Sequence, residues 1–287
     1  MMQASDCQVS LAAEESGLDP EADGGGSTLY GNFRNYYAFH PAHERLKLLP
    51  DDFALAVLRS RSVGEDTGPL RVLDVGCNEG DLTIGLLVKL EEQLKAPAVP
   101  TEHLDRKVSA VGFDLDPVLI ARARDKAQPF RASFVTANIM EYSFPESMRR
   151  AICAQADSPI SGVGCDTNEP NNLNNIFDVV CAFSMTMWIH IHHGDEGLRS
   201  FLRKLADMGQ HLIIEPQPWR CYRTCKQRWR KSHGREPPQL RNLLWRESVS
   251  TDIIKFLCDE CGLHVVSDLG STWSGRHLLW MTKHPLK

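Results

Sequence analysis

The stretch VLDVGCNEGDL, residues 72–82, is the most informative part of this chain. Its first residues are apolar and partly β-branched, as in a buried strand of a parallel sheet. Gly76 permits a sharp turn, and Gly80 lets the backbone approach a ligand or the next helix closely. Asp81 is expected to cap a helix over residues 82–94. The pattern predicts a strand, a ligand-binding turn and a helix, although its G-x-x-x-G spacing differs from the dinucleotide fingerprint G-x-G-x-x-G.

A second apolar run, residues 108–113, is followed directly by an acidic residue, Asp114. In doubly wound α/β folds an acidic residue at this point accepts hydrogen bonds from the ribose hydroxyls of an adenosine ligand. Asp116 is expected to cap the helix that begins at Pro117. The two strand ends together favour an adenosine cofactor over the alternative, an ordinary glycine-rich turn without a ligand.

Strands and helices alternate along the rest of the chain. We expect strands at 133–137, 177–183, 211–215, 263–268 and 277–282, with helices at 117–127, 195–208 and 247–261. Strands separated by helices form a parallel sheet covered on both faces. The last two strands have no helix between them and should form a hairpin that ends the sheet. The prediction is one α/β domain, residues 29–287, with a mainly parallel, seven-stranded sheet.

Two polar segments lie outside this alternation. Residues 1–28 contain six acidic residues and no Lys or Arg, so we expect a disordered tail. Residues 153–175 are rich in Asn and are expected to form a surface loop. The tail lacks the regions of a signal peptide, and no apolar run has the length of a membrane span. We therefore expect a soluble, cytoplasmic protein without a membrane partner.

The nine cysteines fall at irregular spacings, and without a secretory signal they are expected to be free thiols. Two groups have some character of a metal site: Cys221 and Cys225 with Cys258 and Cys261, and His190, His192 and His193 with Asp195. No neighbouring histidine completes the first group, and adjacent histidines of the second cannot all face one ion. We predict no metal.

Five stretches then indicate a family. They are YGNFRNYY at 30–37, DVGCNEGDL at 74–82, FDLDP at 113–117, SMTMWIHIHHGDEGL at 184–198 and IIEPQPW at 213–219. Together they resemble the methyltransferase domain of the bicoid-interacting-protein-three family, over about residues 30–285. The turn is also similar to the first motif of class I S-adenosylmethionine-dependent methyltransferases, with Asn78 in place of the middle glycine. The resemblance implies a Rossmann-like class I fold and S-adenosylmethionine as cofactor.

The family methylates the 5′ ends of RNA. The compact chain is similar to its branch that acts on the 5′-monophosphate of small RNAs, such as precursor microRNA and histidine transfer RNA. The branch that caps an RNA triphosphate has a lysine directly before the tryptophan of the W-x-H region, where this chain has Met187. The loss of a cation there favours a less charged acceptor, such as a monophosphate.

The resemblance also implies the cofactor contacts. These are Tyr37, Arg45, Gly76, Asn78, Gly80, Asp114, Asn138, Ile139 and Phe183. Arg45 suits the methionine carboxylate through paired, charge-assisted hydrogen bonds. Asp114 matches the ribose ligand, and Asn138 and Ile139 match the adenine edge. Alternatively, Arg45 forms a surface ion pair, and Ile139 and Phe183 are ordinary core residues.

The acceptor chemistry needs little acid–base help. A phosphate monoester has a second pKa near 6, so at neutral pH it is largely a dianion and already a nucleophile. The protein must hold the oxygen, the methyl carbon and the sulfur in line. Tyr36, His40 and His190 are the catalytic candidates for orienting the phosphate, and the resemblance supports Tyr36 best. His190 is equally well explained as a core residue bonded to the backbone.

The net charge of the chain is −5, yet one segment, residues 220–231, is strongly basic. Its candidate RNA-binding residues are Arg220, Arg223, Lys226, Arg228, Trp229, Arg230 and Lys231. Basic side chains neutralise backbone phosphates, and aromatic rings such as Trp229 and Tyr222 stack on unpaired bases. The alternative is a solvated helix face. The acidic tail is expected to compete with RNA for this segment.

We therefore predict an O-methyltransferase that uses S-adenosylmethionine to methylate the 5′-monophosphate of small structured RNAs. The expected partners are RNA and RNA-processing proteins, and the expected state is a monomer. The alternatives are a methyltransferase for an RNA triphosphate, a protein or a small molecule, and a non-catalytic RNA-binding scaffold that keeps the cofactor fold.

Overall fold

The computed structural model describes residues 30–31, 36–61, 68–97, 99–100, 106–153, 173–272 and 274–284. The predicted acidic tail and most of the predicted loop at 153–175 lie outside the described residues, so both remain predictions. No helix among the described residues is long and apolar enough to cross a membrane.

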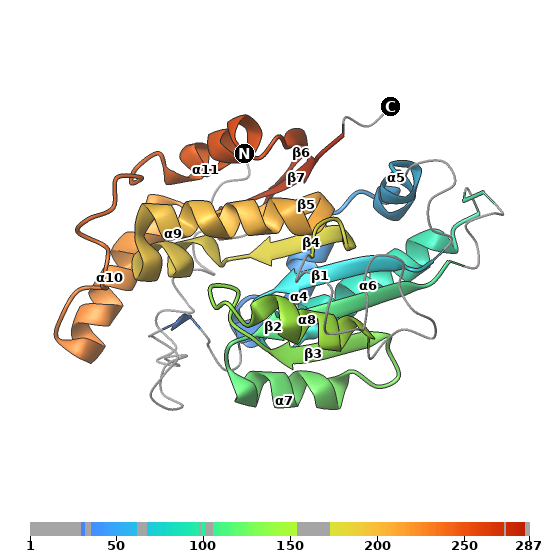
Figure 1. The fold of residues 1–287 in the computed structure, drawn as a ribbon, viewed down its shortest axis with the longest axis horizontal. Coiled ribbons are helices and arrows are strands. Elements are labelled where there is room, and N and C mark those ends of the chain that lie inside the picture. Colours follow the sequence, from blue (N-terminus) through green and yellow to red (C-terminus); the bar gives the residue numbers. More distant parts are fainter. Residues whose placement is uncertain are drawn as a thin grey trace, which may run out of the picture.

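A seven-stranded sheet lies at the centre of the molecule, in the order β3-β2-β1-β4-β5-β7-β6 (Figure 1). Its strands are β1 (Leu70–Val75), β2 (Val108–Asp114), β3 (Ala132–Thr136), β4 (Phe177–Phe183), β5 (Gly209–Glu215), β6 (His264–Ser271) and β7 (His277–Thr282). Strands β1 to β5 pair in parallel, and β7 pairs antiparallel with both β5 and β6. The sheet confirms the predicted class I methyltransferase fold, including the hairpin that ends it.

Helices cover both faces of the sheet. They are α3 (Tyr36–Phe39), α4 (Ala42–Leu46), α5 (Phe53–Arg59), α6 (Asp81–Leu94), α7 (Pro117–Lys126), α8 (Phe144–Cys153), α9 (Thr186–Met208), α10 (Trp219–His233) and α11 (Val249–Asp259). Successive side chains of a strand point to opposite faces, so Leu70 and Val72 join the core layer of α5 and α6, whereas Leu73 and Val75 join that of α8, α9 and α11. Burial on both faces explains why the parallel strands read as continuous apolar runs.

The start of α6 differs from the prediction. Gly80, not Asp81, occupies the N-cap position, with a left-handed backbone at φ 81°. A Cβ atom at Gly80 would lie 2.7 Å from the Phe134 ring, so the close packing of β3 on this turn requires glycine. Asp81 instead forms an ion pair with Lys126 at 2.6 Å. The other predicted cap is confirmed, because Asp116 accepts a hydrogen bond from the backbone N–H of Val118 at 2.8 Å.

Helix α9 begins earlier than the predicted helix at 195–208. It starts at Thr186, directly after β4, and is interrupted at Gly194, where φ is 69° and ψ is −172°. The turn from β4 into α9 passes through Ser184, a non-glycine residue with φ 55°. Tertiary contacts must hold such a backbone, and positions of this kind concentrate at functional sites. Residues 186–193 therefore form the first part of a helix that begins two residues after the turn at the end of β4.

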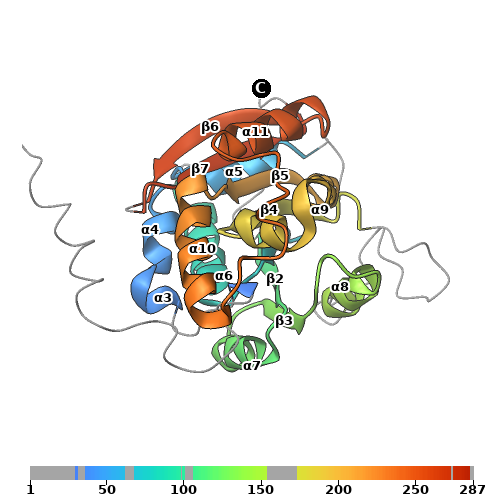
Figure 2. The same ribbon diagram turned by 90° about the vertical axis from the view of Figure 1, so that its left-hand side faces the viewer.

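Helix α10 carries the basic segment and packs into the core through its aromatic residues. Tyr222, Cys225 and Trp229 lie on one face at helical spacing, and all three are buried. Trp229 is 1% exposed. The predicted stacking of Tyr222 and Trp229 on RNA bases is therefore wrong, because both rings fill the space between α10 and the layer of α9 and α11. Helix α10 lies at the left-hand end of the molecule in Figure 1, and Figure 2 looks onto that end.

We expect Trp229→Ala to lower the free energy of unfolding by about 3–5 kcal/mol, the usual effect of removing a large buried ring. Urea unfolding followed by circular dichroism measures the change. Gln227→Ala, on the exposed face of the same helix, is the control and should change stability by less than about 0.5 kcal/mol. A Trp229→Ala variant as stable as this control would contradict the core role.

Candidate active site

The candidate site lies at the point in the sheet where the order of the strands reverses, between β1 and β4. Strands β2 and β3 lie on one side of β1, and β4 and β5 lie on the other. In open α/β sheets, ligands bind at such a switch point, outside the carboxyl ends of the strands. The turn after β1, the end of β2 and the turn after β4 meet there.

The turn after β1 is tightly enclosed. Its backbone has positive φ at Gly76 (74°), Asn78 (51°) and Gly80 (81°). A Cβ atom at Gly76 would lie 2.3 Å from the sulfur of Met185, in the turn after β4. A larger residue at Gly76 would therefore displace the Met185 side chain and strain the left-handed backbone of this turn.

Asp114 joins the end of β2 to this turn. Its carboxylate accepts hydrogen bonds from the backbone N–H groups of Asn78, at 3.1 Å, and Asp116, at 3.0 Å. The residue is only 8% exposed, and this burial raises the pKa of the carboxyl group to about 6. The backbone N–H of Leu115 also interacts with this carboxylate. A carboxylate has about four acceptor positions, so acceptor capacity remains for a ligand hydroxyl group. The arrangement fits the ribose of the predicted cofactor.

The side chains of Asp74 and Tyr37 also support the turn after β1. Asp74 is buried on β1 and accepts a hydrogen bond from Thr83 of α6 at 2.5 Å. Burial raises the pKa of Asp74 to about 6. Tyr37, predicted as a cofactor contact, donates to the backbone carbonyl of Cys77 at 3.5 Å. Tyr37 therefore lies against the turn, as the prediction requires.

The segment after β3 lies at the same edge of the sheet. The Asn138 side chain accepts from the backbone N–H of Met140 at 3.0 Å and shapes its own turn. Ile139 is buried among core residues, and its carbonyl accepts from Lys204 at 2.6 Å. The Ile139 side chain is thus a core residue, the alternative left open above. Phe183 packs partly buried against the core.

Arg45 has a different partner from the predicted one. The residue is 3% exposed, and its guanidinium donates to both carboxylate oxygens of Glu215, at 3.3 and 2.9 Å. Glu215 ends β5 and is completely buried, so its charge requires a cation. The predicted paired hydrogen bonds therefore exist, but to Glu215 rather than to a cofactor carboxylate. Nor is Arg45 in a surface ion pair.

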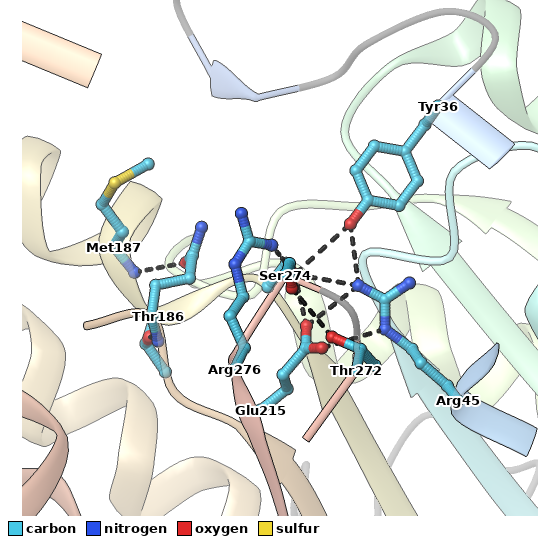
Figure 3. A network of polar contacts seen from close by, with 10 residues as sticks. Tyr36, Arg45, Thr186, Met187, Glu215, Thr272, Ser274 and Arg276 are labelled. Carbon is cyan, nitrogen blue, oxygen red and sulfur yellow. Dashed lines mark hydrogen bonds and ion pairs between the residues drawn. The ribbon is translucent and has the colours of Figure 1, made fainter. Parts of the chain in front are cut away.

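A network of polar contacts extends from this ion pair (Figure 3). Ser184 donates to Glu215 at 2.5 Å and accepts from Arg45 at 3.1 Å. It also accepts from Arg276, which precedes β7, at 2.6 Å. Sequence reasoning missed Glu215, Ser184 and Arg276 as site residues. The signal for Glu215 was its place as an acidic residue at a strand end, as for Asp114.

Two of the three predicted catalytic residues meet at this network. The Tyr36 hydroxyl lies 2.9 Å from Arg45 Nη2 and 3.3 Å from Ser184 Oγ. The Tyr36 ring stacks on His40, with 4.6 Å between ring centroids. Burial and the positive charge of nearby arginines, Arg276 foremost, lower the pKa of His40 to about 3. His40 is therefore neutral at physiological pH.

His190 does not join them. It is fully buried, and its two ring nitrogens lie 3.0 Å from the Tyr222 hydroxyl and 3.3 Å from Asp195. Asp195 also accepts from the backbone N–H groups of Leu244 and Trp245. His190 therefore ties α9 to α10 in the core, and its predicted contact with phosphate is wrong. The described ranges contain no group of three or more His, Cys, Asp or Glu side chains placed to hold a metal ion.

The basic side chains of α10 divide into two sets. In the first set the charged groups already have partners within the protein. Lys226 and Arg230 form ion pairs with Glu236, which also pairs with Arg241 at 2.9 Å. Arg220 belongs to this set as well. Its guanidinium donates to the carbonyls of residues 274 and 275, at 2.7 Å each.

The second set consists of Arg223, Arg228 and Lys231, which are exposed. No described acidic side chain forms an ion pair with any of the three. The surface open to RNA on α10 is therefore smaller than predicted.

We expect Glu215→Ala to lower the free energy of unfolding by about 3–5 kcal/mol, because it leaves the Arg45 charge buried without its carboxylate. The double variant Arg45→Met, Glu215→Leu should lose less, since it buries no unpaired charge. Urea unfolding of the two variants measures the difference. Equal losses would mean that the ion pair itself is not what stabilises this edge of the sheet.

Comparison with known proteins places the chain in a family. A family model described as Bicoid-interacting protein 3 (Bin3) matches residues 177–283. An RNA 5′-monophosphate methyltransferase of Rattus norvegicus is 33% identical over 280 residues, which cover 96% of this chain and 90% of the relative. A Pre-miRNA 5′-monophosphate methyltransferase of Xenopus laevis is 34% identical over 266 residues, covering 91% of this chain and 95% of the relative.

Among solved structures, a magnesium protoporphyrin IX methyltransferase from Synechocystis with bound SAH is 15% identical, covers 97% of this chain and 99% of that protein, and has a TM-score of 0.48. The two RNA methyltransferases match nearly the whole chain, and the family model matches the part that contains β4, Ser184 and Glu215. The chain belongs to the Bin3 family of methyltransferases.

Proposed function

We propose that this chain transfers a methyl group from S-adenosylmethionine to the 5′-monophosphate of small RNAs. One observation carries the proposal: the cofactor turn with Asp114 and the cluster around Tyr36 lie at the same edge of the sheet, joined by the turn after β4. The names of the relatives from rat and frog support an RNA 5′-monophosphate as the acceptor. The name of the frog relative favours precursor microRNA, and histidine transfer RNA stays a prediction.

The residues present fit S-adenosylmethionine, which supplies an electrophilic methyl on sulfur when bound. The Asp114 carboxylate would accept hydrogen bonds from the ribose hydroxyls with its remaining acceptor capacity. Positive φ at Gly76 and Asn78 turns the backbone at the bottom of the site. Arg45 is taken by Glu215, so we assign the methionine end to the turn and Tyr37 rather than to Arg45. This assignment keeps the predicted location of the cofactor and removes Arg45 from its contacts.

The acceptor needs orientation more than activation. A 5′-monophosphate is mostly dianionic at pH 7, so its oxygen attacks without a strong base. The Tyr36 hydroxyl can donate a hydrogen bond to that phosphate, and neutral His40 beside it adds no further charge that would quench the nucleophile. Holding the oxygen in line with the methyl group supplies the rate enhancement.

A monophosphate is favoured over a triphosphate by the surroundings of Met187. This side chain is buried, and its backbone N–H donates to Gln217 at 2.9 Å. The position where the capping branch has lysine therefore offers no charge for additional phosphates. The exposed cations of α10, Arg223, Arg228 and Lys231, would contact the RNA backbone. A monomeric, cytoplasmic enzyme, with RNA-processing proteins as further partners, remains part of the proposal.

The acceptor is tested with one hairpin RNA that carries a 5′-monophosphate, a 5′-triphosphate or a 5′-hydroxyl. Labelled methyl from S-adenosylmethionine should appear only on the monophosphate RNA, and removal of the end group should release it. Equal label on all three RNAs would place the methyl on a base or a ribose. Tight RNA binding without any label would favour the non-catalytic scaffold.

We expect the affinity for S-adenosylhomocysteine to fall as the pH decreases through about 6. The pKa of Asp114 is about 6, so the carboxylate that accepts two hydroxyl groups is present above this pH and protonated below it. Asp114→Asn should weaken binding by about 10- to 100-fold, the loss of a charge-assisted hydrogen bond, and should remove the pH dependence.

Isothermal titration calorimetry between pH 5 and pH 8 measures both effects. Asp74→Asn is the matched control, because Asp74 has a similarly raised pKa but faces Thr83 inside the fold. This variant should keep the pH dependence of the wild type. Loss of the pH dependence in Asp74→Asn, but not in Asp114→Asn, would show that Asp74 rather than Asp114 is the titrating group.

A further inference from the structure

We infer that Arg276 binds the 5′-terminal phosphate of the acceptor, in a subsite that it forms with Tyr36 and His40. The inference rests on the proposed function and adds a residue to it. Arg276 stands in the connection between β6 and β7, far along the chain from every predicted site residue.

The guanidinium of Arg276 has an unused hydrogen-bond donor. Its Nη1 donates to Ser184 at 2.6 Å, but its Nε atom is buried and has no hydrogen-bond partner among the described residues. A buried donor without an acceptor is unfavourable, so such a group calls for a ligand. The Cys221 thiol also hydrogen-bonds to the Arg276 side chain, but a thiol is only a weak acceptor. Phosphate suits this position, because arginine binds it through two parallel N–H groups.

The charges of the network also lack one anion. Two guanidinium groups, Arg45 and Arg276, meet at Ser184, and Glu215 is the single carboxylate among the described partners of that hydroxyl. His40 is neutral and lies close enough to Arg276, Arg45 and Arg228 for their charges to lower its pKa. The cluster therefore carries an excess positive charge at its edge, which an anionic ligand would compensate.

The subsite is next to the place of methyl transfer. Ser184, the partner of Arg276, directly precedes Met185, whose sulfur packs against Gly76 of the cofactor turn. Tyr36 reaches the same serine from α3, at 3.3 Å. In Figure 3, Tyr36, Arg45, Glu215 and Arg276 converge from four separate segments. A phosphate held by Arg276 and Tyr36 would thus face the methionine end of the cofactor.

The basic helix holds the Arg276 segment in place. Arg220 of α10 donates to the carbonyls of Ser274 and Gly275, the two residues before Arg276. Gly275 has φ 64°, and a Cβ atom there would lie 2.8 Å from the Arg220 guanidinium. The helix that offers cations to the RNA backbone therefore also positions the residue that we assign to the RNA end.

The test compares one hairpin RNA with a 5′-monophosphate or a 5′-hydroxyl, bound to the full chain in the presence of S-adenosylhomocysteine. The wild type should bind the phosphorylated RNA more tightly. Arg276→Ala should weaken binding of the phosphorylated RNA by about 10-fold or more, as expected for a lost charge-assisted hydrogen bond, to the affinity of the hydroxyl RNA. Its affinity for the hydroxyl RNA and for S-adenosylhomocysteine should stay within about two-fold of the wild type, a change of under about 0.5 kcal/mol.

Two further variants sharpen the result. Arg223→Ala removes an exposed cation of α10 and should weaken both RNAs equally, because it contacts no RNA end. Arg276→Gln keeps a donor for Ser184 without the guanidinium, and it replaces Arg276→Ala if that variant fails to bind S-adenosylhomocysteine. It should also lose the preference for the phosphorylated end.

The outcomes separate this inference from the proposed function. If folded Arg276 variants keep the preference of the wild type for the 5′-phosphate, Arg276 is not the phosphate ligand, and the proposed function stands. If the wild type itself shows no such preference and no methyl transfer to the phosphate, both are overturned.

Discussion

Arg45 of α4 and Glu215 at the end of β5 form a buried ion pair on which the geometry of the whole site depends. Charges of this kind are tolerated in a protein interior only with close partners. The pair therefore fixes the N-terminal helices against the carboxyl edge of the sheet. Ser184, bonded to both partners, extends the same constraint to β4 and to the segment before β7.

Two neighbouring places at this edge of the sheet suit different ligands, a nucleoside and an anion. The turn after β1, with its positive φ at Gly76, Asn78 and Gly80, and Asp114 form a place that suits a nucleoside. The cluster of Tyr36, His40 and Arg276 forms a positively charged place that suits an anion. The turn after β4 lies between them, because Ser184 contacts Tyr36 and Met185 lies against Gly76. Ser184 itself has a positive φ, and strained positions of this kind concentrate at functional sites.

The positive charge that we propose to contact RNA is local rather than global. The chain carries a net charge of −5, and Glu236 neutralises part of α10 through Lys226 and Arg230. A few exposed cations beside the site can still set the orientation of an RNA, because phosphate contacts position the nucleic acid. Most of the recognition would then depend on the RNA end itself.

The sequence by itself determined four features: the mainly parallel α/β sheet with its terminal hairpin, the turn after β1, the cap at Asp116 and the family. All of these rest on residues close together in the chain or on the period of apolar side chains. Tertiary structure alone decided the partners of the functional side chains. Arg45 meets a carboxylate 170 residues away, and His190 and Trp229 are core residues although their local surroundings look polar or basic. Contacts across such distances depend on how whole helices and strands pack, and no local pattern encodes which buried charge or ring will face which neighbour.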